Sequence, residues 1–261
     1  MSHQKGTERC FDINYSDNPS KRCSNWDVHW NVSTAATITV QTEWIHIQYE
    51  ERVAFTETYG FAGNQGAVNL EGILMRPKGQ PSKTLLIFMH PTSTLQLLPV
   101  PRAMVQSGAH VLCAASRYAK NDAALIMEKV LLDLGACIRH AKHVLGYVKV
   151  AIVGWSGGGS LAVFYQAEAE VPTLTHAPAG DPVDITGADL IPADAVIFQA
   201  AHLSRGHLLA DVLDPSVRDE LHPDDRIREL DLYDRDNPSQ PPYSAEFVAR
   251  YRTAQLERMR R

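Results

Sequence analysis

Hydrophobic residues along the chain fall into short apolar runs that alternate with longer amphipathic segments. Residues 84–89 and 110–115 form unbroken apolar runs, which are typical of strands buried on both faces of a parallel sheet. Residues 147–153 and 195–201 form two further runs of this kind. Between them, residues 122–145 carry apolar side chains three and four positions apart, as in a helix that packs on a sheet. The pattern predicts an α/β fold with a mostly parallel sheet and helices on both faces.

An antiparallel hairpin is predicted ahead of this alternation. Apolar and polar residues alternate from Thr37 through Trp44 to Phe55, and a loop rich in Gly and Asn separates this strand from a second one over residues 67–75. The long helix of residues 122–145 is expected to begin at a cap formed by Asn121 or Asp122 and to stop at Gly146. These elements define an α/β core over residues 36–202.

Two polar segments flank the core. Residues 1–35 show neither helical nor strand periodicity, which predicts a poorly ordered leader. Residues 203–261 contain no apolar run, so they are expected to be helical without a further strand. Within them, residues 244–261 form an amphipathic helix, and His222 to Asp225 form a polar turn. The chain stops inside that helix without a closing residue, and we therefore expect a truncated protein.

Composition and charge narrow the class of protein. Hydrophobic residues make up 44% and charged residues 21% of the chain, as in ordinary globular proteins, and the net charge of -5 argues against a nucleic-acid partner. No secretory signal and no apolar stretch of membrane-spanning length occurs, so we expect a soluble cytoplasmic protein. The cysteines lack metal-ligand or redox spacing, and we expect no metal or cofactor, with Cys113 and Cys137 as buried free thiols.

The chemistry is indicated by Gly154-Trp155-Ser156-Gly157-Gly158, which lies between a predicted strand and a predicted helix. This arrangement is typical of a nucleophile elbow, a sharp turn that holds a serine in strained geometry at the end of a strand. Gly154 and Gly158 are expected where a side chain would clash with the neighbouring strand and helix. The alternatives are a structural turn with an incidental serine and a dinucleotide-binding loop. The second is disfavoured because Ser156 would place a side chain in the path of the pyrophosphate.

Residues from about 44 to 201 resemble the α/β-hydrolase superfamily, through the G-W-S-G-G motif and the upstream Met-His-Pro-Thr of residues 89–92. The resemblance implies that the backbone N–H of Gly157 is one donor of an oxyanion hole and that Thr92, or Ser93, supplies the other. Pro91 replaces the usual glycine and has no N–H. For His90 the favoured interpretation is a structural imidazole that binds the loop by hydrogen bonds.

The resemblance also implies an acid and a histidine on later strands, which the sequence after Ala201 does not predict. His202 directly follows the strand beside the elbow strand and is the possible base within this chain, although a cap or surface histidine is the favoured interpretation. In the resembled family, helical insertions at this place form a lid, so residues 203–261 are expected to be a helical cap. Leu208 and Leu209 belong to the apolar face that would turn toward substrate.

Two functions remain open from the sequence. The first is a serine hydrolase of esterase type that cleaves a small-molecule acyl substrate through an acyl-enzyme on Ser156, with a histidine and an acid that lie beyond residue 261 or come from a partner chain. The second is a catalytically incompetent remnant that binds a small molecule or a partner without turnover. In both cases the apolar strand of residues 195–201 would leave an uncovered sheet edge, which predicts self-association.

Overall fold

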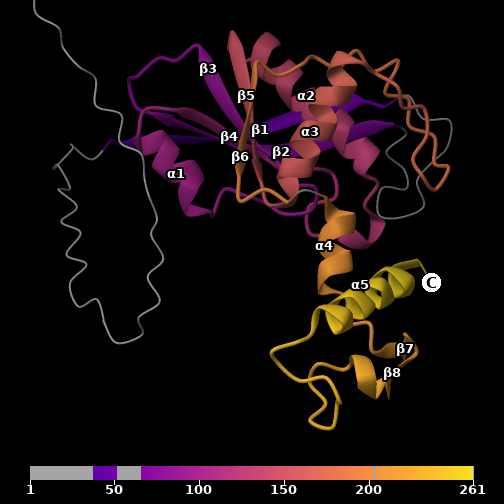
Figure 1. The fold of residues 1–261 in the computed structure, drawn as a ribbon. Helices are drawn as coiled ribbons and strands as arrows, with labels where there is room; N and C mark the ends of the chain where they lie inside the picture. Colours follow the sequence, from indigo (N-terminus) through magenta and orange to yellow (C-terminus); the bar gives the residue numbers. More distant parts are fainter. Residues whose placement is uncertain (1–37, 52–65, 203, 261) are drawn as a thin grey trace, which may run out of the picture. The chain divides into compact units, whose positions relative to one another are not determined.

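The computed structural model describes residues 38–51, 66–202 and 204–260, and within them a mixed sheet of six strands forms the core (Figure 1). The predicted leader and Phe55 lie outside the described residues. The strand order is β1-β2-β4-β3-β5-β6, with β3 to β6 parallel and with β1 and β2 antiparallel to their neighbours. The strands are β1 (Val40–Glu50), β2 (Ala67–Pro77), β3 (Thr84–Phe88), β4 (His110–Ala114), β5 (Lys149–Trp155) and β6 (Ala195–Gln199). The predicted mostly parallel sheet is confirmed.

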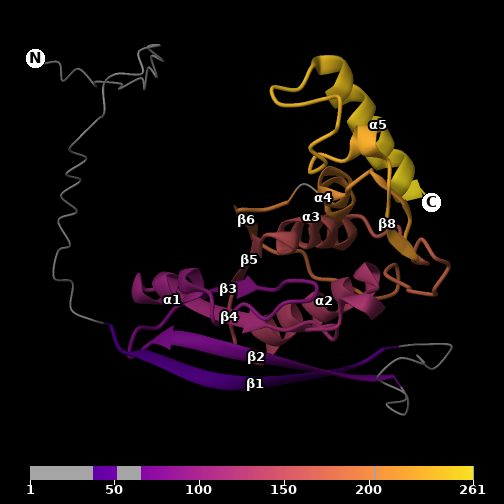
Figure 2. The same cartoon turned by 90° about the horizontal axis from the view of Figure 1, so that it is seen from below.

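The predicted hairpin forms the long antiparallel edge of this sheet (Figure 2). β1 and β2 pair without a register shift from Val40 opposite Pro77 to Glu50 opposite Ala67. β2 then pairs with β4, which places the hairpin beside the parallel strands. Gly72 of β2 allows close contact here, because a Cβ at this position would lie 2.9 Å from the Leu112 side chain.

Helices cover both faces of the sheet, as the alternation of elements predicts. On β3, Ile87 packs in the cluster that contains residues of α2 (Met127–His143) and α3 (Gly157–Glu170). The next residue, Phe88, packs in a second cluster with Val105 of α1 (Pro99–Gln106). Successive side chains of a strand point to opposite faces, so α1 covers one face, and α2 and α3 cover the other.

The long helix begins five residues later than the sequence predicts. Residues Asp122–Ala124 form a short 3-10 turn, Leu125 and Ile126 are extended, and α2 starts at Met127 without a side-chain cap. The prediction of a cap at Asn121 or Asp122 was therefore wrong. The periodic apolar spacing misleads here because Leu125 and Met127 line a cavity next to Ser156. Gly146, with a φ of 77°, follows the helix as predicted.

The C-terminal segment contains two strands that the sequence analysis did not predict. Its helices are α4 (Arg205–Val212) and α5 (Ala245–Arg260), and the second agrees with the predicted amphipathic helix. Between them, β7 (Val217–Asp219) and β8 (His222–Arg226) pair antiparallel. The predicted polar turn at His222 is thus part of a strand. All side chains of β8 are exposed, so no hydrophobic alternation marks it.

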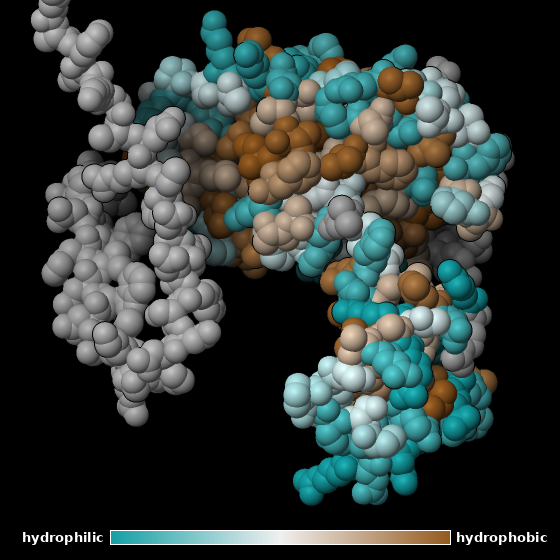
Figure 3. Space-filling view, in the orientation of Figure 1, coloured by the Kyte–Doolittle hydropathy of each residue, from teal (hydrophilic) through white to brown (hydrophobic). Residues whose placement is uncertain are grey.

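An apolar edge is exposed at β6, which pairs only with β5 among the described strands. Ile197 and Phe198 of β6 are 38% and 58% exposed, and Val163 of α3 is 52% exposed. Hydrophobic residues gather over this part of the molecule in Figure 3. Exposed apolar edges template pairing with another chain, so self-association through β6 stays a prediction.

Two predicted buried thiols are confirmed. Cys113 of β4 and Cys137 of α2 are free and buried. Burial raises the pKa of the Cys113 thiol to about 12 and raises the pKa of Cys137 as well. Both thiols are therefore protonated and unreactive near neutral pH. In the described part of the chain, no helix combines the length and apolar character needed to cross a membrane.

A buried ion-pair network joins the hairpin, the loop after β4 and α2. Arg117, in the loop after β4, pairs with Asp133 of α2 at 3.0 Å and also with Glu51. Lys129 of α2 lies 3.5 Å from the second oxygen of Glu51. These four side chains are at most 7% exposed, and their formal charges cancel. Tyr49 completes the network by donating its hydroxyl to Asp133 at 2.7 Å.

We expect Asp133→Asn to lower the free energy of unfolding by about 3 kcal/mol, because it leaves a buried guanidinium without its carboxylate. The matched control is Glu43→Gln, since Glu43 pairs with Arg76 at the surface, where the two side chains are 49% and 31% exposed. This control should change the free energy by less than about 1 kcal/mol. Urea denaturation measures both values, and equal small losses would contradict a stabilising role for the buried network.

Candidate active site

The backbone at Ser156 is held in a conformation that non-glycine residues rarely adopt. β5 ends at Trp155, α3 begins at Gly157, and Ser156 between them has φ 53° and ψ -122°. Its N–H donates to the carbonyl of Gln199 on β6 at 3.3 Å. Its carbonyl accepts from the N–H groups of Gly159 at 3.1 Å and His202 at 3.0 Å. This geometry is that of the predicted nucleophile elbow.

Three glycines provide the space for this turn. A Cβ on Gly154 would lie 2.6 Å from the Cα of Gly159, and one on Gly158 would lie 2.5 Å from the carbonyl oxygen of Met89. A Cβ on Gly159 would lie 2.3 Å from the Cβ of Ala201. Contacts below 3.0 Å with backbone atoms cannot relax without moving a strand. The turn therefore requires glycine at these positions because of close packing, as predicted for Gly154 and Gly158.

A small cavity of about 170 Å³ lies beside the elbow. The site residues that the sequence singles out, namely Ser156, Gly157, Thr92 and His202, all line it. The structure adds Asp122, which lines the same cavity. The sequence analysis missed Asp122 as a site residue, because its position ahead of an apolar periodic segment was interpreted as a helix cap.

His90 organises the loop on the opposite side of the cavity. Its Nδ1 atom accepts hydrogen bonds from the N–H groups of Thr92 at 3.1 Å and Ser93 at 3.0 Å. The imidazole thus binds its own loop, as the favoured interpretation of the sequence proposes. The Thr92 N–H, which the resemblance implies to be an oxyanion donor, is directed at His90 in this structure. Its role as a donor to substrate stays a prediction.

The loop after β4 is hydrogen-bonded to the loop that carries His90. The Ser116 hydroxyl donates to the carbonyl of Pro91, and the Lys120 N–H donates to the carbonyl of Thr92 at 2.7 Å. Arg117 lies between these two contacts and is fixed by its backbone N–H, which donates to Asp133 at 2.9 Å. The buried ion-pair network therefore holds the segment on which the site loop rests.

The electrostatics around Ser156 favour negative charge. Gly157 is the first residue of α3, and the free N–H groups and positive end of the helix dipole lie at this terminus. The His202 backbone is bonded to Ser156, and its half-buried side chain lines the cavity. Within the described residues, no hydrogen bond joins the Ser156 hydroxyl to His90, His202 or Asp122. Ser156, His90 and His202 thus line one cavity, but in the part of the chain that the structure describes the Ser156 hydroxyl makes no hydrogen bond to either imidazole.

A larger apolar groove adjoins the small cavity. It measures about 650 Å³ and is lined by α3 and the end of β6, including Phe164 and Phe198. Ser160 and His202 line both hollows. Leu208 of α4 also lines the small cavity, and its place near substrate stays a prediction.

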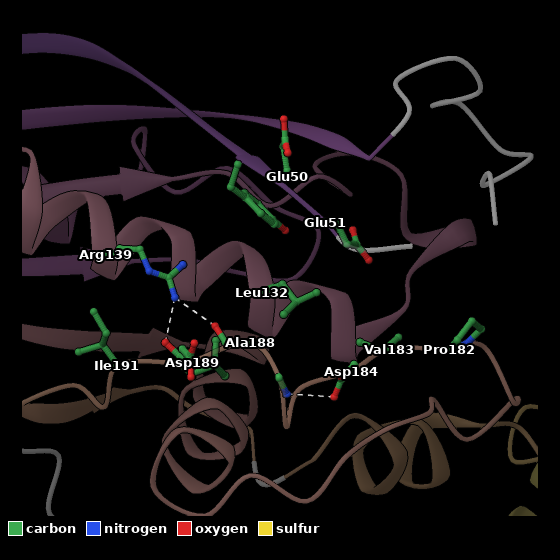
Figure 4. A pocket seen from close by; sticks show the side chains of 13 residues that line it. Glu50, Glu51, Leu132, Arg139, Pro182, Val183, Asp184, Ala188, Asp189 and Ile191 are labelled. Carbon is green, nitrogen blue, oxygen red and sulfur yellow. Dashed lines mark hydrogen bonds between the residues drawn. The ribbon is translucent and has the colours of Figure 1, made fainter. Parts of the chain in front are cut away.

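Another cavity, of about 450 Å³, lies between α2 and residues 182–191 (Figure 4). Its polar groups bind one another: Arg139 donates to the carbonyls of Ala188 at 3.1 Å and Asp189 at 2.8 Å, and the Gly187 N–H donates to Asp184 at 3.0 Å. Among the described residues, the lining contains no serine, cysteine or histidine. Across the described ranges, no group of three or more His, Cys, Asp or Glu residues is placed to hold a metal. The Ser156 cavity is thus the better candidate for chemistry.

We expect Gly154→Ala to lower the free energy of unfolding by about 1–3 kcal/mol, because its Cβ overlaps the backbone of Gly159. Gly206→Ala is the control, since Gly206 lies in α4 and its Cβ would meet only the Ser204 hydroxyl at 4.0 Å. The control should leave stability unchanged or raise it by up to about 1 kcal/mol. Urea denaturation compares the two variants, and wild-type stability of Gly154→Ala would contradict the packing assigned to the elbow.

No protein-family model matches the sequence, and a search of curated proteins finds no similar sequence. Among solved structures, a brefeldin A esterase described as a bacterial homologue of human hormone-sensitive lipase matches 61% of this chain and 39% of its own, with 18% identity and a TM-score of 0.36. A bacterial heroin esterase matches 63% and 45% of the two chains, with 16% identity and a TM-score of 0.40.

A third solved structure, an alpha-beta serine hydrolase homologue from Coxiella burnetii, matches 54% of this chain and 86% of its own, with 19% identity and a TM-score of 0.34. The chain thus spans less than half the length of the first two structures. The strand order and the strained serine between β5 and α3 carry the structural assignment. The described part of the chain has an α/β-hydrolase-like fold.

Proposed function

We propose that this protein is a serine hydrolase that cleaves a carboxylic ester, or a related acyl substrate, through an acyl-enzyme on Ser156. The observation that carries the proposal is the backbone of Ser156, with φ 53° and ψ -122° between β5 and α3. Strain of this kind costs about 1–3 kcal/mol and persists where function requires it. Here it lifts the serine hydroxyl to the carboxyl edge of the sheet, beside a cavity.

In the proposed reaction, the Ser156 oxygen attacks the carbonyl carbon of the substrate while a base takes its proton. The carbonyl electrons move onto oxygen, and the Gly157 N–H at the start of α3 donates to the resulting oxyanion. The alcohol then leaves with a proton from the protonated base, and water repeats the sequence to release the acid. The apolar groove beside Phe164 and Phe198, which shares Ser160 and His202 with the Ser156 cavity, would receive an apolar acyl or alcohol group.

We assign the base, within this chain, to His202. Its backbone N–H is 3.0 Å from the Ser156 carbonyl oxygen, and its side chain lines the cavity that also holds Ser156. Catalytic hydrogen bonds are often loose in proteins without substrate, so the missing contact to the hydroxyl is compatible with this role. Asp122 lines the same cavity, and its carboxylate is our candidate for stabilising the imidazolium that forms during attack.

A fluorophosphonate probe tests the nucleophile. Wild-type protein should be labelled on Ser156, and Ser156→Ala should not be labelled, because the probe reacts only with an activated serine. Ser107→Ala is the matched control, since Ser107 lies at the end of α1 and donates to Ala103, away from the cavity. It should be labelled like wild type. Equal labelling of wild type and Ser156→Ala would contradict the proposal.

A second function is favoured by the absence, among the described residues, of a hydrogen bond between the Ser156 hydroxyl and an imidazole. In that case the protein binds an acyl compound in the cavity without turning it over. The same experiment separates the two functions, because a binder would take up a non-hydrolysable ester analogue, measurable by calorimetry, while wild type and Ser156→Ala both stay unlabelled.

We expect His202→Ala to slow fluorophosphonate labelling by about a hundredfold or more, which is the usual contribution of a general base. His46→Ala is the control, because His46 lies on β1 at the other side of the sheet and bonds Asn69. Its labelling rate should equal that of wild type. A labelling rate for His202→Ala within about twofold of wild type would assign the base to a residue other than His202.

A further inference from the structure

We propose that the Nε2–H group of His90 is the second hydrogen-bond donor of the oxyanion hole, beside the Gly157 backbone N–H. The inference rests on the proposed function of Ser156 as an acyl-transfer nucleophile. It reassigns a role that the sequence places on a backbone N–H of the loop, and it gives the imidazole a direct contact with the substrate oxygen.

The backbone N–H groups of the proposed oxyanion loop already donate hydrogen bonds within the loop. Pro91 has no N–H, and the N–H groups of Thr92 and Ser93 both donate to His90 Nδ1, at 3.1 Å and 3.0 Å. The Thr92 carbonyl is bonded to the Lys120 N–H, which fixes the orientation of this peptide segment. For Thr92 or Ser93 to serve a substrate oxygen, it would have to give up a bond to the ring.

Two donors at Nδ1 define the protonation of the imidazole. A ring nitrogen that accepts hydrogen bonds carries a lone pair and no proton. In a neutral imidazole the proton is then on the other nitrogen, so Nε2 of His90 is a donor. The N–H groups of residues 92 and 93 are thus used to bind Nδ1. The donor that this loop can offer to a substrate is the Nε2–H of the His90 side chain.

Nε2 is the part of the ring that points at the elbow. It lies 2.9 Å from the position of a Cβ on Gly157, whereas the adjacent ring carbons Cε1 and Cδ2 lie at 3.5 Å and 3.6 Å. His90, Ser156 and Gly157 line the same small cavity. A donor at this vertex faces the space next to the Gly157 N–H, where the oxyanion would form.

The residue type at position 157 supports this assignment. Gly157 is not among the glycines with positive φ, so its backbone does not require glycine. The elbow pattern also leaves this position open to any residue. What excludes a side chain here is the imidazole, because a Cβ would contact Nε2 at 2.9 Å. The Trp155 ring also lies near the imidazole, with the centroids 6.1 Å apart and the planes tilted by 50°.

Two substitutions separate the donor from the loop-binding function of His90. In His90→Asn the amide oxygen can replace Nδ1 as the acceptor for Thr92 and Ser93, but no donor reaches the position of Nε2. In His90→Gln the amide nitrogen can replace Nε2 as the donor, but no acceptor remains at Nδ1. Asn thus keeps the loop and loses the donor, and Gln does the reverse.

For a p-nitrophenyl ester that wild type hydrolyses in a Ser156-dependent manner, we expect His90→Asn to lower kcat by about a hundredfold or more with little change in KM. The Asn variant should retain the unfolding free energy of wild type. His90→Gln should retain more kcat than His90→Asn although it is less stable. Wild-type kcat in His90→Asn, together with a larger loss in His90→Gln, would show that the ring only holds the loop and would overturn the proposal.

Nitrogen-15 NMR of the wild-type ring gives a readout that does not depend on turnover. We expect the neutral Nε2–H tautomer in the free protein, and a downfield shift of the Nε2–H proton when a phosphonate is bound to Ser156. An Nδ1–H tautomer, or an unchanged proton resonance in the adduct, would overturn the donor assignment alone. If instead Ser156→Ala hydrolyses the ester like wild type, the proposed function fails and this inference fails with it.

Discussion

The strained backbone of Ser156 is the constraint on which the rest of the site depends. A non-glycine residue at φ 53° and ψ -122° is unfavourable by itself, so its surroundings must hold it there. Three hydrogen bonds do this, from the Ser156 N–H to Gln199 and from Gly159 and His202 to the Ser156 carbonyl. They connect the turn to β6 and to the first turn of α3. Because Ser156 joins β5 to α3 and is hydrogen-bonded to the end of β6, its backbone has little freedom to move.

A second layer of contacts fixes the opposite wall of the cavity. The buried pairs of Arg117 with Asp133 and Glu51 hold the loop after β4 against α2 and the hairpin. That loop in turn binds the carbonyls of Pro91 and Thr92. Breaking such buried pairs is costly because it strands a charge in a medium of low polarity. The loop that carries His90 is therefore positioned by charges that do not line the Ser156 cavity.

The sequence predicts the parts of the fold that repeat a physical pattern. Buried strands such as residues 84–89 carry apolar side chains on both faces, and the glycines around Ser156 reflect contacts that any elbow must make. The sequence does not predict the start of α2, because Leu125 and Ile126 continue the helical spacing although their backbone is extended. It also misses β8, whose side chains are all exposed and so lack alternation.

The sequence likewise predicts the part of the site that follows from a local pattern and misses the part that does not. The elbow motif identifies Ser156 and Gly157 without a structure, because both roles follow from the backbone turn. The place of Asp122 in the cavity wall, the direction of the Thr92 N–H and the approach of His90 to Gly157 depend on contacts between segments far apart in the sequence. Such contacts leave no local pattern. The glycine at position 157 is the one sequence signal for the imidazole beside it.

Trapping of the acyl-enzyme tests the central claim most directly. The protein would be mixed with p-nitrophenyl acetate, quenched in acid within the first turnover and digested, and its peptides analysed by mass spectrometry. We predict an acetyl group on Ser156, in an amount that matches the burst of p-nitrophenol. A burst without acetyl on Ser156, or acetyl groups spread over surface lysines with none on this serine, would contradict its role as the nucleophile.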